Sequence, residues 1–269
     1  MSTINLAIAG AGGRMGRMLL EAAGSQPGMA VSGALEHVDS PLLGRDAGEL
    51  AASAKGFIIT ADPLIGLAGA TVLIDFTRPE GTLRHLAACR RQGVNAVIGT
   101  TGFTPDQRRE IEAAAAEVAI VFAPNMSIGV NVTLKLIEMA TRALHQHYDI
   151  EIIEAHHKFK VDAPSGTAIQ MGEVAAAAMG KALDEIGVFE RHGVVGERKS
   201  GTIGFTAIRG GDIIGDHTVM FAGTGERIEI SHRSSTRSGY AQGAMRAAQF
   251  LAGKSSGLYG MADVLGLHQ

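Results

Sequence analysis

The segment EAHHKFKVDAPSGTA (154–168) gathers two adjacent histidines, two lysines and an aspartate, and then turns into Pro-Ser-Gly-Thr. Such a group could bind a metal, activate a serine nucleophile, cradle a phosphate, or form an acid/base cluster that faces a small anion. A shared metal is disfavoured because His156 and His157 close a predicted strand, where successive side chains point to opposite faces. A nucleophilic serine is disfavoured because the sequence around Ser165 is not a G-x-S-x-G turn.

Ser165 fits better as the N-cap of a helix, with Gly166 and Thr167 in the first turn and an apolar stripe after them. The free amides of these three residues would lie at the positive end of that helix, beside the two lysines of the segment. This arrangement favours binding of one or two carboxylates, next to a histidine that titrates near neutrality and can supply or relay a proton. Taken alone, the segment could equally be a charged surface loop followed by a capped helix.

A glycine-rich loop near the N-terminus has the context of a dinucleotide-binding motif, because AIAGAGGRMGR follows a predicted strand and opens a predicted helix. Its glycines allow a tight turn and a close approach of the backbone to a pyrophosphate, which the helix N-terminus attracts. Glu36 closes the next strand, 20 residues after Gly16, where an acid can hydrogen-bond the hydroxyls of an adenosine ribose. The cofactor-binding residues expected here are Gly10, Gly12, Gly13, Arg14, Met15, Gly16, Glu36 and His37.

Small polar residues follow three further predicted strands, at the edge where sheets of this kind bind ligands. They lie in DFTRPEGT (75–82), IGTTGFT (98–104) and APNMSIGVN (123–131), the last of which could also form a hinge. Ordinary turn chemistry would explain each stretch taken singly. Together with the glycine loop, they lead us to expect cofactor contacts from Arg78, Gly99, Thr100, Thr101, Ala123, Pro124, Asn125 and Met126.

The elements that must position these residues alternate between strand and helix in the first half of the chain. Strands are predicted at 4–9, 29–35, 71–77, 95–101 and 118–124, with helices that include 14–23 and 104–116. This alternation predicts an α/β protein with a Rossmann-like, doubly wound parallel sheet. Beyond a helix at 127–144, strands at 148–155, 202–209, 212–222 and 227–234 and a helix from Ser165 predict an α+β domain. Its sheet should be mostly antiparallel because glycine turns join the last strands, and a final helix follows at 240–252.

Composition excludes several other classes of protein. The net charge of −3 and the scarcity of basic runs give no surface for nucleic acid, and the N-terminal apolar run is too short for a signal peptide or a membrane span. The single cysteine, Cys89, rules out an internal disulfide framework and fits a reducing compartment. We therefore expect a soluble cytoplasmic protein whose partner is a small molecule, with no metal, nucleic acid or membrane.

The segment 154–168 resembles a family signature, through the set Glu154, His156, His157, Lys160, Asp162, Pro164, Ser165, Gly166 and Thr167. The family is that of the bacterial dihydrodipicolinate (4-hydroxy-tetrahydrodipicolinate) reductases. The glycine loop, D-F-T-R-P-E-G-T, G-T-T-G-F and N-x-S-x-G-V-N resemble the same family in the same order, so the resemblance spans nearly the whole chain.

The resemblance implies NAD(P)H-dependent reduction of 4-hydroxy-tetrahydrodipicolinate, a cyclic dicarboxylate, to tetrahydrodipicolinate in lysine and diaminopimelate biosynthesis. It implies a dinucleotide-binding domain at 1–127, rejoined by the C-terminal region 238–269, and a substrate-binding and oligomerisation domain at 128–237. It also implies a homotetramer built through the antiparallel sheets.

Carried over by position, the resemblance assigns the acid/base role to His156 and a second proton-donating or substrate-orienting role to Lys160. His157 matches a substrate contact, and Gly166 and Thr167 match the carboxylate-binding turn that Ser165 opens. Hydride addition to C4 of a conjugated imine must be balanced by a proton that arrives nearby, while both carboxylates are held. Which of His156 and Lys160 donates the proton is left open by the sequence.

One position departs from the family pattern, in which many members carry arginine after the strand-end acid. Here Glu36 is followed by His37, and an unperturbed histidine is mostly neutral at pH 7 and attracts a phosphate weakly. We predict use of both NADH and NADPH, with NADH at least as good as NADPH, unless Arg14 and Arg17 reach the phosphate. Two other functions stay open, namely another two-domain NAD(P)-dependent dehydrogenase and a non-catalytic dinucleotide sensor.

Overall fold

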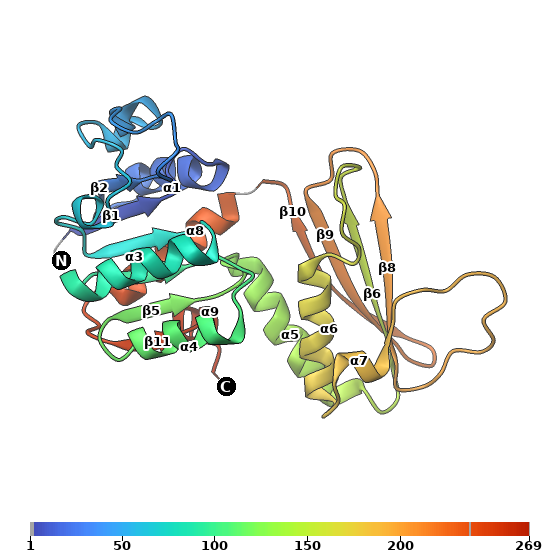
Figure 1. Cartoon of the computed structure of the whole chain (residues 1–269). Coiled ribbons are helices and arrows are strands. Elements are labelled where there is room, and N and C mark those ends of the chain that lie inside the picture. Colours follow the sequence, from blue (N-terminus) through green and yellow to red (C-terminus); the bar gives the residue numbers. More distant parts are fainter. Residues whose placement is uncertain (1–2, 237, 269) are drawn as a thin grey trace. The chain divides into compact units, whose positions relative to one another are not determined.

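The computed structural model describes residues 3–236 and 238–268, which form two compact units (Figure 1). The first unit consists of Met1–Ile128 together with Ser238–Gln269, and the second consists of Gly129–Arg237. Each unit has its own sheet and its own hydrophobic core.

The sheet of the first unit is parallel and doubly wound, as predicted, with strand order β11-β5-β4-β3-β1-β2. Its strands are β1 (Ile4–Ala9), β2 (Met29–Leu35), β3 (Val72–Asp75), β4 (Asn95–Ile98), β5 (Ala119–Phe122) and β11 (Gly257–Tyr259). β1 and β2 match the predicted ranges. β3, β4 and β5 end two or three residues earlier than predicted, because the chain there already turns into the loops that carry the expected cofactor contacts. β11 was not predicted, since so short a strand leaves no periodic signal.

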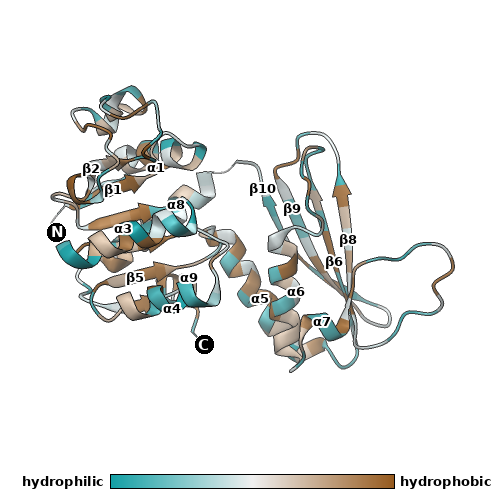
Figure 2. Ribbon diagram, in the orientation of Figure 1, coloured by the Kyte–Doolittle hydropathy of each residue, from teal (hydrophilic) through white to brown (hydrophobic). Residues whose placement is uncertain are grey.

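Helices cover both faces of this sheet. α1 (Arg14–Ser25) and α8 (Ser238–Leu251) share one core cluster with the strands, and α3 (Pro79–Gln92) and α4 (Pro105–Ala114) share the other. The unit is completed by α2 (Pro63–Gly66), α9 (Met261–Leu265) and two 3₁₀ turns at Ala47–Glu49 and Ala52–Ala54. Figure 2 shows strands that are mainly hydrophobic beneath helices whose outward turns are hydrophilic. Thr104, the first residue of the helix predicted at 104–116, is the N-cap of α4 and forms a capping box with Gln107.

The sheet of the second unit is mixed, with strand order β10-β9-β6-β8-β7. Its strands are β6 (Asp149–His156), β7 (Gly187–Val188), β8 (Ile203–Arg209), β9 (Gly215–Ala222) and β10 (Arg227–Ser234). β9 and β10 form the predicted hairpin, and β6 is antiparallel to β9 but parallel to β8. The expected pairing of β8 with β9 is wrong. The connection at 210–214 crosses the end of β6, where the N–H of Lys158 donates to the carbonyl of Gly211.

Two long helices pack on one face of this mixed sheet. They are α5 (Ile128–Leu144) and α6 (Gly166–Ala178), and the short α7 (Leu183–Ile186) follows α6. Ile150 and Ile152, alternate residues of β6, lie in one core cluster with Ile137 of α5 and Met171 of α6. Because side chains alternate along a strand, Glu154 and His156 face the same helix-covered side as these isoleucines.

Within the described part of the chain, no helix is both long enough and apolar enough to cross a membrane. Cys89 is buried in α3, where burial raises the pKa of its thiol.

Candidate active site

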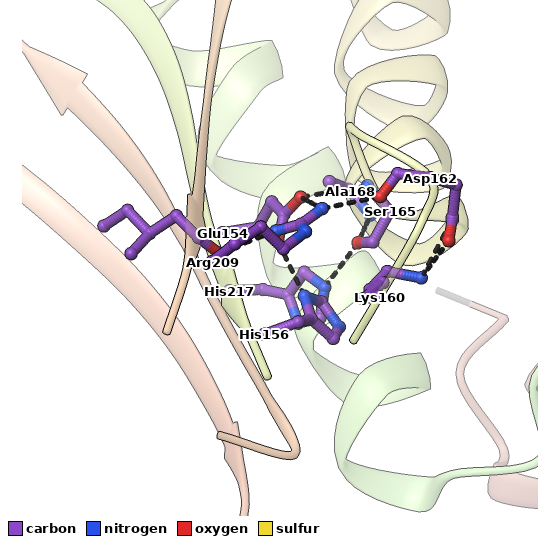
Figure 3. A network of polar contacts seen from close by, with 9 residues as sticks. Glu154, His156, Lys160, Asp162, Ser165, Ala168, Arg209 and His217 are labelled. Atoms are coloured by element: carbon purple, nitrogen blue, oxygen red, sulfur yellow. Dashed lines mark hydrogen bonds and ion pairs between the residues drawn. The ribbon is translucent and has the colours of Figure 1, made fainter. Parts of the chain in front are cut away.

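His156 ends β6 and is fixed by a carboxylate two residues earlier in the same strand (Figure 3). Its Nδ1 lies 2.6 Å from Oε2 of Glu154, and both side chains are almost fully buried. Because a carboxylate accepts a hydrogen bond, Nδ1 carries the hydrogen. Among the described residues no hydrogen bond reaches Nε2, so this is the ring atom left for proton exchange.

Glu154 accepts hydrogen bonds from three different parts of the second unit. Arg209 of β8 donates from Nη1 to Oε2 at 2.8 Å and from Nη2 to Oε1 at 2.6 Å, and the amide of Ser165 donates at 3.1 Å. Burial alone would raise the pKa of Glu154, but the bonds from Arg209 and His156 outweigh it and lower the pKa below its ordinary value. Glu154 is therefore an ionised acceptor that holds the imidazole in one orientation.

Ser165 is the N-cap of α6, as predicted, because its side chain accepts the N–H of Ala168 at 3.2 Å. Its Oγ also lies 2.8 Å from Nε2 of His217, a residue of β9 that pairs with Glu154 in the sheet register. The ring of His217 meets that of His156 edge to face, with 5.1 Å between the centroids. Burial, with a smaller effect of the nearby His156, lowers the pKa of His217 to about 4, so His217 is neutral near pH 7.

The loop between β6 and α6 brings Lys160 to the same region (Figure 3). Its ammonium lies 2.7 and 2.8 Å from the two carboxylate oxygens of Asp162, whose pKa this hydrogen bond lowers. The carbonyl of Asp162 accepts from Nη2 of Arg209 at 2.7 Å, so the loop is tied to the residue that holds Glu154. Lys160 is thus a mostly buried cation held in place by a neighbouring carboxylate.

The remaining residues predicted to bind substrate lie at the two ends of this loop. His157 follows β6, and its ring lies 6.3 Å from that of Phe159, centroid to centroid. Gly166 and Thr167 form the first turn of α6, where Gly166 is exposed and an added Cβ would meet nothing within 4 Å. The amide of Ser165 is not free as predicted, because it donates to Glu154. Gly166 and Thr167 nevertheless lie at the positive end of the helix dipole, which favours an anion.

The glycine loop of the first unit joins β1 to α1 and contacts the end of β2. Oε1 of Glu36 accepts the amide of Gly12 at 2.6 Å, and Oε2 accepts the amide of His37 at 3.1 Å. Gly10 has a φ of 67°, and a Cβ at Gly16 would overlap the backbone of Gly10 and Ala11. These positions therefore require glycine for the tight turn and for close packing of the helix on the strand.

The start of α1 has the character of a phosphate site. Gly13 is its N-cap, no side chain caps it, and no acidic residue lies in the first turn. The amides of Arg14, Met15 and Gly16 have no intrahelical acceptor, and the helix dipole favours an anion there. The loop thus fits the pyrophosphate of a dinucleotide, and Glu36 lies beside it with a carboxylate suited to ribose hydroxyls.

The other predicted cofactor residues lie in loops at the same edge of this sheet, because all its strands run parallel. Arg78 is the N-cap of α3, and Gly99, Thr100 and Thr101 follow β4. Thr101 is exposed, whereas Thr100 is buried, with its hydroxyl 2.8 Å from that of Thr82. The hydroxyl of Thr100 is therefore engaged inside the protein, and only its backbone is left for a ligand.

Below these loops lies a buried polar cluster that the sequence did not predict. Oδ1 of Asp75, at the end of β3, accepts from Thr77, and Oδ2 lies 2.7 Å from Nδ1 of His85. The same Oδ1 accepts from Thr100 at 3.4 Å. The cluster connects the loops after β3 and β4 from the interior side.

The stretch after β5 is largely interior. Ala123 is buried, and the amide of Ser127 donates to Oδ1 of Asn125 at 2.9 Å. The side chain of Met126 lies in the core cluster shared by α1 and α8, while Pro124 is exposed. Any contact of Met126 with a cofactor would therefore use its backbone.

Arg209 and His217 were missed by the sequence reasoning, and Glu154 was not assigned an orienting role. Glu154 could have been found, because a spacing of two along a strand places it on the same face as His156. Arg209 and His217 lie on strands that contact β6 only through the observed strand order, which no local pattern indicates. No group of three or more potential metal ligands occurs within 3–236 and 238–268.

The first unit has a doubly wound sheet and a glycine loop that opens an uncapped helix. The second unit holds a lysine and a histidine that a carboxylate orients. Together these features define a nicotinamide-dependent oxidoreductase. Sequence models of the N- and C-terminal parts of dihydrodipicolinate reductase match residues 4–126 and 129–265. The chain belongs to the dihydrodipicolinate reductase family, which confirms the resemblance, and it is an NAD(P)H-dependent oxidoreductase.

Individual relatives agree with this assignment. The 4-hydroxy-tetrahydrodipicolinate reductase of Nitrosospira multiformis is 60% identical over 269 residues, which cover 100% of both chains. That of Cupriavidus pinatubonensis is 61% identical over 264 residues, covering 98% of this chain and 100% of the relative. The solved structure of dipicolinate-bound dihydrodipicolinate reductase from Paenisporosarcina sp. TG-14 has a TM-score of 0.78 and 25% identity, covering 97% of this chain and 98% of that one.

Proposed function

We propose that this chain reduces 4-hydroxy-tetrahydrodipicolinate to tetrahydrodipicolinate with NAD(P)H, in lysine and diaminopimelate biosynthesis. The observation that carries the proposal is the bond from Nδ1 of His156 to Glu154, beside the N-terminus of α6. This arrangement leaves Nε2 of His156 for a proton and places the N-terminus of α6 beside it, where a carboxylate can bind. The names of the relatives, and the dipicolinate in the related solved structure, support the same substrate class.

In this proposal His156 is the proton donor and Lys160 holds the substrate. The 4-hydroxyl group and a hydrogen of ring C5 first leave the substrate as water, which gives the conjugated imine. When bound, the reduced nicotinamide would supply the hydride that forms the new C–H bond at ring C4. The negative charge that this addition leaves on the conjugated imine is neutralised by a proton from Nε2 of His156. Glu154 stabilises the imidazolium from which that proton comes, because it accepts the N–H of Nδ1.

The two carboxylates of the substrate need separate partners. Lys160 offers a point cation, and Gly166 and Thr167 lie at the positive end of α6. Asp162 holds the ammonium of Lys160 from one side, which keeps the long side chain ordered before substrate arrives. His157 completes the substrate contacts.

For the cofactor, the amides of Arg14, Met15 and Gly16 would hold the pyrophosphate and Glu36 the ribose hydroxyls. We propose that both NADH and NADPH are used and that NADH is at least as good. His37 is exposed and occupies the position where many family members have arginine. Its Nδ1 lies 3.4 Å from the carboxylate of Asp39, which adds a negative charge to that of Glu36. A 2′-phosphate would meet that carboxylate and Glu36, whereas a ribose diol would not be repelled.

One absorbance assay of the nicotinamide, run with different substrates, separates this proposal from its alternatives. NADH or NADPH oxidation is followed by absorbance while the product of dihydrodipicolinate synthase is supplied, with pyridine-2,6-dicarboxylate as a planar competitor. The proposal predicts that the cofactor is oxidised and that the competitor inhibits this oxidation. It also predicts that kcat falls in His156→Gln and that the substrate KM rises in Lys160→Ala. NADH that binds but stays reduced would support a dinucleotide sensor, and turnover of an amino acid or sugar would support another dehydrogenase. An NADPH kcat/KM more than about tenfold above that of NADH would refute the cofactor preference.

We also propose a cytoplasmic homotetramer assembled through the mixed sheet of the second unit, which rests on the family membership. Size-exclusion chromatography with light scattering tests the oligomeric state directly.

A further inference from the structure

Nε2 of His156 lies against a glycine of the neighbouring strand. Gly215 precedes Asp216, which pairs with Ala155, so it stands beside His156 at the end of the β6–β9 ladder. A Cβ built on Gly215 would lie 3.1 Å from Nε2 of His156 and 3.5 Å from Cδ2. The first distance is shorter than an ordinary van der Waals contact, so any side chain here would press on the ring atom that is left for proton exchange.

The backbone of Gly215 does not itself require glycine. Its φ is not in the left-handed region, and it lies in a strand, where alanine is tolerated better than glycine. The three heavy atoms nearest to the added Cβ all belong to the rings of His156 and His217. The absence of a side chain therefore leaves space specifically next to these two imidazoles.

His217 packs against the ring of His156 and also borders the space that Gly215 leaves. It occupies the next helix-facing position of β9, its Nε2 lies 2.8 Å from Oγ of Ser165, and its ring packs edge to face on His156. Glu154 holds the opposite edge of the His156 ring through Nδ1. The imidazole of His156 is thus held at Nδ1 by Glu154 and by ring contact with His217, while no hydrogen bond within the described part of the chain engages Nε2.

We propose that Gly215 and His217 are positioning residues for proton transfer by His156, with Gly215 keeping Nε2 accessible and His217 holding the ring in place. The proposal rests on the proposed function of His156 as proton donor. It extends that function to two residues of β9 that need not touch the substrate.

The main test is Gly215→Ala in the full-length enzyme, compared with Gly210→Ala as the control. Gly210 lies in the neighbouring connection, its φ is not in the left-handed region, and an added Cβ would meet nothing within 4 Å. The N–H that it donates to the carbonyl of His156 is kept in alanine. We expect Gly215→Ala to lower kcat by about 10- to 100-fold, because small misplacements of a catalytic group cost this much. Gly210→Ala should stay within about twofold of wild type.

Three further readouts distinguish positioning from a general structural defect. In Gly215→Ala, the melting temperature and the Kd for NADH should stay near wild type, while the solvent deuterium isotope effect on kcat should rise because proton transfer becomes slower. Reaction of His156 with diethyl pyrocarbonate, read by mass spectrometry, should also slow. If kcat and this reactivity remain at wild-type levels, the role of Gly215 is refuted.

A second pair of variants tests His217 if Gly215→Ala does not fold. His217→Gln can still hydrogen-bond Oγ of Ser165 and should keep kcat within about fivefold, whereas His217→Leu removes the bond and should lower kcat by at least about tenfold. Equal kcat values for the two variants would overturn the role of His217. His156→Gln with full kcat would instead refute the proposed function, so the two failures are distinguishable.

Discussion

Replacing Glu154 by glutamine perturbs the centre of the candidate active site with almost no change of shape. The carboxylate accepts two hydrogen bonds from Arg209, one from Nδ1 of His156 and one from the amide of Ser165. Glutamine offers one acceptor oxygen and one donor NH₂ group. At least one of the three donors must then face the NH₂ group, and an imidazolium at His156 loses the charge that stabilised it.

The structure sets the size of the two expected effects. Removing one partner of a buried ion pair costs about 3–5 kcal/mol, and the low end applies because Arg209 keeps bonds to the carbonyls of Ile208 and Asp162. We therefore expect a loss of about 3 kcal/mol in the free energy of unfolding. Loss of a positioned general acid typically costs roughly 10²- to 10⁴-fold, so kcat should fall within that range.

Urea unfolding and steady-state kinetics at neutral pH measure both effects, and NADH titration checks that the first unit is intact. Glu151→Gln is the matched control. Glu151 lies on the same strand and also holds two arginines, Arg191 and Arg198, but it lies on the opposite face of the sheet from His156. It should lose stability and keep kcat. The reasoning is refuted if Glu154→Gln folds and retains the wild-type kcat, or if Glu151→Gln lowers kcat as much.

Three further substitutions have defined outcomes. The pKa of His217 is about 4 in the folded protein against 6.5 for an ordinary histidine, so its stabilising effect is complete above pH 6.5 and is lost as the pH falls towards 4. His217→Gln should therefore reduce the loss of unfolding free energy between pH 7 and pH 5 by about 2 kcal/mol, and an unchanged pH dependence in urea titrations would contradict this. His37→Arg adds a permanent charge at an exposed position and should raise kcat/KM for NADPH relative to NADH by roughly tenfold; no change in that ratio would place the 2′-phosphate elsewhere. Thr104→Ala removes the side chain that caps α4 and should lower the free energy of unfolding by about 1 kcal/mol, measured by urea titration, with kcat unchanged.

Much of the fold follows from local patterns. The strands 4–9 and 29–35 are short apolar runs ended by glycine or a polar residue, and the observed β1 and β2 have these bounds. Thr104 and Ser165 cap helices because their hydroxyls accept amides a few residues away, which is a local interaction. The glycine loop could also be recognised, since its strand–loop–helix context is contiguous in sequence.

The pairing of the second sheet could not be predicted in this way. β8 and β9 are neighbours in sequence and looked like a hairpin, but β6 lies between them. Strand order depends on which apolar faces bury one another across the whole unit, and a glycine-containing connection is compatible with either a hairpin or a crossing.

The residue types of the site and their local setting follow from the sequence, because His156 ends a strand, Lys160 lies in a loop and Ser165 begins a helix. Which atom of His156 is left for a proton follows only from the folded structure, because it depends on Glu154, Arg209, Gly215 and His217. These residues come from three strands that meet only through the order β9-β6-β8. Hydrogen bonding and steric space act over a few ångströms, and residues 50 or more positions apart in the chain reach such distances only in the folded sheet.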